Sequence, residues 1–157
     1  MYKNTHNNTQ SILEKLKKYC VLQNRCKSEI KKKIKRITIN KEYQDNILKI
    51  LSDEKYIDEE RYAISFCRGK FKINKWGKNK IRNELKKKQV PDININKGLS
   101  SISDIEYYTE IEKQYKKKKK TITEKNILIK KNKIVRYLIN KGYESNLVWE
   151  KLRELKE

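Results

Sequence analysis

Apolar residues recur at the spacing of helical turns along nearly the whole chain. They return after three or four residues, so one face of each helix would be apolar and the opposite face charged. Only residues 38–40 and 93–96 alternate as strands do, and both segments are too short to support a sheet. We therefore expect an all-α protein.

Helix-start signals divide this pattern into nine segments. Ser11 with Glu14 and Ser103 with Glu106 have the spacing of a capping box, and Asp58 is a suitable N-cap. The expected helices begin near residues 11, 28, 41, 58, 77, 91, 103, 125 and 145, with Ser28 capping the second and Gly142 ending the eighth.

The helices form an internal repeat of about fifty residues with three helices in each unit. The apolar pair of the middle helix recurs in phase as Ile30/Ile34, Ile81/Leu85 and Ile134/Leu138, and an apolar residue follows each pair at Ile39, Val90 and Tyr143. Units this small cannot bury their apolar faces alone, so we expect them to stack into an elongated, curved array. A flexible polar leader (residues 1–10) would precede one domain (residues 11–157) with units at 11–56, 57–102 and 103–157.

The seventh helix is expected to bury one stripe and to end before a lysine run. The stripe consists of Ile105, Tyr108, Ile111 and Tyr115. The run Lys116–Lys120 could continue this helix or form a mobile linker, and its charge density favours the linker.

The chain is strongly basic, with 41 Lys and Arg against 20 Asp and Glu, which gives a formal net charge of +21. Such an excess favours nucleic acid or an acidic protein surface as a partner. The codon bias of an AT-rich genome could also supply many of the lysines. The charges nevertheless concentrate on the middle helix of each unit, where they predict either a continuous basic stripe or three solvated helix faces. The residues that we expect to contact a partner are Arg25, Lys31, Lys35, Arg68, Lys78, Arg82, Lys86, Lys133 and Arg136.

Residue types that catalysis or metal binding require are scarce. His6 is the only histidine and lies in the polar leader, and the three cysteines have no metal-binding spacing. We interpret Cys20 and Cys67 as buried apolar groups, and the acidic residues 58–60 as favourable charges in the first turn of a helix. We expect no enzyme, no metal, no cofactor and no small-molecule substrate. No segment has the length of a transmembrane helix or a signal peptide, so we expect a cytoplasmic protein without a membrane partner.

One central segment resembles a known family. The run Ile57-Asp58-Glu59-Glu60-Arg61-Tyr62-Ala63, preceded by Leu51, is similar to the signature of RecX-type recombination regulators. Further matches to the pattern of that family are Arg25, Ser28, Glu29, Ile30 and Ile34 upstream, and Arg68, Trp76-Gly77, Ile81, Glu84-Leu85 and Gly142-Tyr143 downstream. The chain departs from the family at Gln89-Val90, where a glycine usually precedes the apolar residue.

The resemblance implies three tandem three-helix repeats and a regulator that lies along the groove of the RecA–single-stranded DNA filament. It implies modulation of RecA ATPase and recombinase activity in DNA repair and recombination, with inhibition as the expected direction. Ser28, Asp58, Trp76 and Gly77 would then be structural rather than contact residues. The alternative is a general nucleic-acid-binding helical module that has no RecA partner.

Overall fold

The computed structural model describes the backbone of residues 3–154 and the side chains of residues 10–154. Over that range the chain is all-α, as predicted, and contains no strand. Its nine helices are α1 (Lys3–Leu22), α2 (Lys27–Lys35), α3 (Lys41–Asp53), α4 (Glu59–Asn74), α5 (Lys78–Lys87), α6 (Asp92–Ser100), α7 (Asp104–Thr121), α8 (Ile127–Asn140) and α9 (Ser145–Glu154).

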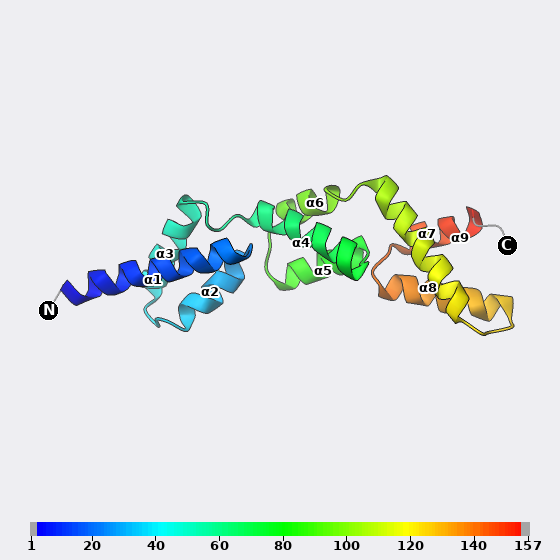
Figure 1. Ribbon diagram of the computed structural model, residues 1–157, viewed down its shortest axis with the longest axis horizontal. Coiled ribbons are helices and arrows are strands. Elements are labelled where there is room, and N and C mark those ends of the chain that lie inside the picture. The colour runs from blue at the N-terminus through cyan, green and yellow to red at the C-terminus, as the bar shows by residue number, and fades with distance from the viewer. Residues whose placement is uncertain (1–2, 155–157) are drawn as a thin grey trace.

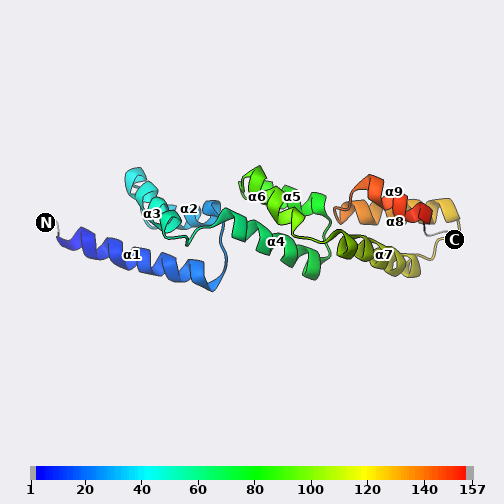
Figure 2. The ribbon, with the colours of Figure 1, turned by 90° about the horizontal axis from the view of Figure 1, so that it is seen from above.

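The helices are arranged as three consecutive three-helix units in an elongated molecule (Figure 1). Seen from above, the long first helices α1, α4 and α7 follow one side, and the pairs α2/α3, α5/α6 and α8/α9 lie along the other (Figure 2). The predicted architecture of tandem three-helix repeats is therefore confirmed.

The core has two separate parts. The first unit has an apolar cluster of its own, built around Leu16, Ile34 and Ile47. The second and third units share a larger cluster, which also takes in Cys26 from the first unit. The apolar pairs predicted to be central are buried in all three middle helices: Ile30/Ile34, Ile81/Leu85 and Ile134/Leu138.

Some helix caps follow the sequence signals and others do not. The carboxylate of Asp58 accepts a hydrogen bond from Arg61 N at 2.8 Å and caps α4 as predicted. Ser28 does not cap α2, because Cys26 occupies the N-cap position. The Ser28 hydroxyl instead donates to the carbonyl of Lys88 in the next unit, at 2.6 Å.

Both predicted capping boxes are wrong. Helix α1 already begins at Lys3, so Ser11 lies within the helix, and residues 3–10 of the expected leader are helical. Ser103 occupies the N-cap position of α7, but its side chain makes no capping hydrogen bond. The side chain of His6 lies outside the described residues.

Helix α7 differs from its prediction in the face that it buries and in its length. Tyr107 is 1% exposed, whereas Tyr108 is 41% and Ile105 80% exposed. The prediction is therefore wrong for the first half of the stripe, whereas Ile111 and Tyr115 are buried as predicted. The run Lys116–Lys120 belongs to α7 and is not a linker. Positive charge near a helix C-terminus interacts favourably with the helix dipole, and Lys116 pairs with Glu112 one turn earlier at 2.5 Å.

The second and third units meet through backbone atoms. Gly77 N donates to the carbonyl of Lys141 at 2.8 Å, and Asn79 N donates to that of Gly142 at 3.0 Å. Gly142 has φ +94°, a left-handed conformation that glycine adopts readily. An ideal Cβ on Gly77 would lie 2.2 Å from the carbonyl carbon of Gly142, so the junction tolerates no side chain there.

We expect Gly77→Ala to destabilise the array by about 2 to 3 kcal/mol, because the added methyl group must displace main chain. Thermal unfolding followed by circular dichroism measures the change. Gly69→Ala is the matched control. Its Cβ would meet nothing within 4 Å, so alanine in this helix interior should stabilise by about 1 kcal/mol. Equal effects of the two substitutions would contradict the close contact.

Candidate interaction surface

The basic middle helices line up along one edge of the molecule. Figure 1 shows α2, α5 and α8 in a row along the lower edge, with α3 and α6 above them. Of the nine predicted contact residues, seven belong to these three helices: Lys31, Lys35, Lys78, Arg82, Lys86, Lys133 and Arg136. Arg25 lies in the turn between α1 and α2, and Arg68 lies on α4.

Helix α2 offers the least engaged charges in this row. Lys31, Lys32, Lys35 and Arg36 are exposed, and no ion pair joins them to another described residue. A polyanion could therefore bind them without displacing an internal partner.

The charges of α5 are largely engaged within the molecule. The Lys78 ammonium lies 3.1 Å from Asp104 and 4.6 Å from the ring centroid of Tyr107. Arg82 donates to the Asn96 amide oxygen at 2.9 Å. The remaining pairs are Lys86–Asp92 at 3.6 Å, Lys87–Glu84 at 2.7 Å and Lys88–Glu29 at 2.6 Å. Exposed pairs of this kind contribute little to stability, so a phosphate could replace the more exposed carboxylates.

Helix α8 and Arg68 complete the predicted set. Lys133 pairs with Glu124 at 3.0 Å. Arg136 is exposed and has no ion pair within the described part of the chain. Arg68 is also exposed and borders a shallow hollow together with Asp58, Glu60 and Arg61, so the charges there are mixed, unlike those of the middle helices.

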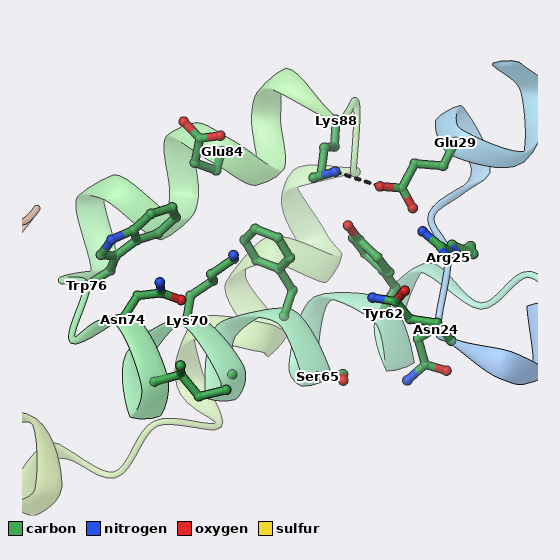
Figure 3. A pocket seen from close by; sticks show the side chains of 14 residues that line it. Asn24, Arg25, Glu29, Tyr62, Ser65, Lys70, Asn74, Trp76, Glu84 and Lys88 are labelled. Atoms are coloured by element: carbon green, nitrogen blue, oxygen red, sulfur yellow. Dashed lines mark hydrogen bonds and ion pairs between the residues drawn. The ribbon is translucent and has the colours of Figure 1, made fainter.

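A cavity of about 430 Å³ lies between the α1–α2 turn, α4 and α5 (Figure 3). The ammonium group of Lys70 lies 5.0 Å from the ring centroid of Trp76 and 5.4 Å from that of Phe66. Lys80 lies over the same indole at 4.6 Å. The aromatic faces are therefore already occupied by cations, which agrees with the expectation that Trp76 is structural.

The cavity opens where the first unit meets the second. Here Lys88 pairs with Glu29 (Figure 3), and Lys27 N donates to the Glu59 carboxylate at 2.6 Å. The Arg25 guanidinium lies 4.5 Å from the ring centroid of Tyr19, and its buried Nε has no hydrogen-bond partner in the described structure. This junction is polar, unlike the glycine contact between the second and third units.

Burial changes the acid–base properties of several groups near this junction. It raises the pKa of the Glu59 carboxyl, although the hydrogen bond from Lys27 N acts in the opposite direction. Burial also raises the pKa of the Cys67 thiol to about 12, and it raises the pKa of the Cys20 thiol. Both cysteines are buried, as predicted, and a thiol with a raised pKa is a poor nucleophile.

The described side chains contain no group of three His, Cys, Asp or Glu that could hold a metal ion. Between residues 3 and 154, no helix combines the length and the apolarity that a membrane crossing requires.

Sequence reasoning missed the roles of Lys70, Lys88 and Tyr107. Lys70 follows Phe66 by one helical turn, and this spacing could have suggested their contact. Tyr107 accepts a hydrogen bond from Lys78 N at 2.8 Å and donates to Glu144. No local pattern indicates this contact, because the three residues belong to two units.

Two family models match the chain. The model of the second three-helix domain of RecX matches residues 58–99, and that of the third matches residues 104–152. Together they cover more than half of the sequence. The chain belongs to the RecX family. The matched segments correspond to α4–α6 and α7–α9, the two units that share one core.

Curated relatives and solved structures agree with this assignment. The chain is 26% identical to "Regulatory protein RecX" of Bacillus cytotoxicus and 28% identical to that of Bacillus mycoides, over 139 residues in each case. Those residues are 88% of this chain and 52% of each relative, so the chain spans about half the length of the curated relatives it matches. The crystal structure of RecX from Lactobacillus salivarius has a TM-score of 0.86 at 22% identity and covers 96% of this chain and 97% of its own. A second RecX crystal structure has a TM-score of 0.85 at 24% identity, with 96% and 74% covered. The structures show the shared fold.

We predict that Glu59→Gln makes the stability of the protein less dependent on pH. Because the folded-state pKa of Glu59 is raised, the folded protein retains this proton more strongly than the unfolded chain does. Wild-type stability should therefore fall as the pH rises from the ordinary glutamate pKa, about 4.3, through the raised folded value. The glutamine side chain can still accept from Lys27 N but carries no charge.

Urea unfolding between pH 4 and 7 measures this effect. The gain in stability of Glu59→Gln over wild type should grow with pH across that window. Glu150→Gln, at an exposed position on α9, is the matched control for the loss of one carboxylate. A constant difference for Glu59→Gln would refute the assigned effect of burial.

Proposed function

We propose that this chain is a non-enzymatic regulator that binds RecA–single-stranded DNA filaments and inhibits RecA ATPase and recombinase activity. The observation that carries the proposal is its membership of a family whose matched relatives are named regulatory protein RecX. The row formed by α2, α5 and α8 supports a long polyanionic partner. Such a regulator would act in the cytoplasm, in DNA repair and recombination.

The proposed mechanism is electrostatic and steric. The exposed Lys31, Lys32 and Lys35 of α2 meet phosphate or acidic protein groups first, because they give up no ion pair with another described residue. The lysines of α5 leave exposed carboxylates such as Asp92 and bind anionic groups of the filament instead. The elongated body then spans more than one repeat of the filament and alters its extension or disassembly.

RecA ATPase on single-stranded DNA, measured at increasing amounts of this protein, tests the proposal. Inhibition at amounts well below one molecule per RecA protomer supports it, because one bound regulator would then affect many protomers. An effect that requires DNA-saturating amounts and disappears with modest salt would instead favour the general nucleic-acid-binding module.

The double substitution Lys31→Gln/Lys35→Gln should weaken binding to the filament. The loss of two phosphate contacts would make the negative slope of log K against log salt shallower by roughly 1.4, at about 0.7 for each contact on a single strand. Fluorescence anisotropy with labelled filaments over a salt series measures this slope. Lys41→Gln/Lys49→Gln removes the same charge from exposed positions on α3, away from the basic row. If the two variants lose equal affinity for the filament, α2 contributes to binding only through its net charge.

A further inference from the structure

The two internal junctions share one design. At each, the start of the middle helix is covered by the unit that follows. Lys27 N at the start of α2 donates to Glu59, and Lys78 N at the start of α5 donates to Tyr107. The first N–H groups of a helix lack partners within that helix, so the following unit supplies them.

The equivalent position in the last unit is the start of α8. Its N-cap and its first residues both differ from those of α2 and α5. Asn126 caps the helix by itself, accepting from Ile129 N at 3.1 Å. The next three residues are Ile127, Leu128 and Ile129, and they are 66%, 67% and 45% exposed. The inner middle helices begin instead with Lys-Ser-Glu (residues 27–29) and Lys-Asn-Lys (residues 78–80).

The first unit shows the complementary half of the same junction. Val90 and Tyr143 follow the middle helices of the second and third units and are 5% and 1% exposed. Each packs at the boundary with the preceding unit. Val90 belongs to the cluster that contains Cys26, and the Tyr143 hydroxyl donates to the Lys75 carbonyl at 3.1 Å. The equivalent residue of the first unit is Ile39, which is 96% exposed, since no other described residue of this chain covers it.

The two apolar surfaces lie at opposite ends of the molecule. Helix α8 starts at the far end of the third unit, and the α2–α3 connection lies toward the N-terminal end (Figure 1). Repeat arrays normally end in units with a polar outer face, because an apolar end attracts another unit. The three described units expose one apolar half-junction at the start of α8 and the other at the α2–α3 connection.

We propose that copies of this chain associate head to tail, with the start of α8 in one copy receiving the α2–α3 connection of the next. The contact continues the junction that already joins the units within one chain. Such an interface is heterologous, so it extends into a filament of copies unless the rotation between them closes a ring. The net charge of +21 opposes association, so added salt should strengthen it by screening the repulsion. An assembly bridged by nucleic acid would show the reverse dependence.

Sedimentation velocity from micromolar to near-millimolar protein, free of nucleic acid, tests the proposal at about 0.1 M and about 0.5 M NaCl. We expect the mean mass to rise with concentration, and to rise more at the higher salt. Leu128→Gln and Ile39→Gln should each raise the apparent dissociation constant by about ten-fold, because each removes one apolar half of the contact. Ile93→Gln is the control, at a residue that is 65% exposed on α6 of the middle unit, and should leave association unchanged.

Mixing the two variants distinguishes this interface from a symmetric one. The Ile39→Gln chain keeps an intact α8 surface, and the Leu128→Gln chain keeps an intact α2–α3 connection. A mixture should therefore form heterodimers with wild-type affinity, although each variant alone associates about ten-fold more weakly. Failure to recover association on mixing overturns the proposal. So does a protein that stays monomeric throughout, or an association that Ile39→Gln leaves unchanged.

Discussion

The array depends on the contact between the start of one unit's middle helix and the unit that follows. A helix start carries N–H groups without partners in its own helix, and here the neighbouring unit accepts some of these bonds. Asn79 N bonds to Gly142 O and Lys78 N bonds to Tyr107. The spacing and direction of all three units follow from this arrangement, because it joins the main chain of one unit to the main chain or to side chains of the next.

The two junctions between units are held together by different kinds of contact. Between the second and third units, two glycines let backbones meet directly, and one apolar core continues across the boundary. Between the first and second units, Lys27, Ser28 and Glu29 bond to Glu59 and Lys88 through side chains. The first unit has an apolar core separate from that of the second unit, and a cavity lies beside this junction. The first unit is therefore held to the rest by polar contacts more than by apolar burial.

The excess of lysine serves two purposes in this structure. On α2 the charges are exposed and have no ion-pair partner among the described residues. On α5 and at its C-cap several of them bridge helices or units, as Lys78 and Lys88 do. A basic surface that also contributes to the junctions keeps its shape when it meets a polyanion, which suits the proposed role of the chain on a filament.

The sequence by itself determined the helical class, the three-unit repeat and most of the apolar positions, since these follow from local periodicity. It also identified the Asp58 cap and the left-handed glycine at Gly142, which depend on residues close by in the chain. It failed where the deciding partner lies in another unit. Ser28 bonds to Lys88 rather than capping its own helix. Tyr107 is buried in place of Tyr108, packed between Phe71 of the second unit and Tyr143 of its own. Its hydroxyl bonds to Lys78 N and Glu144.

Ile39 is another residue whose burial the sequence pattern alone does not determine. It matches Val90 and Tyr143 in sequence, yet it is exposed, because no other unit of the described structure packs against it. Periodicity reports which face of a helix is apolar, but only the stacking of the units decides which apolar residues find a neighbour to cover them. The arrangement of the basic residues into one edge has the same origin. Each middle helix is basic in the sequence, whereas their alignment in a row is set by the junctions between units.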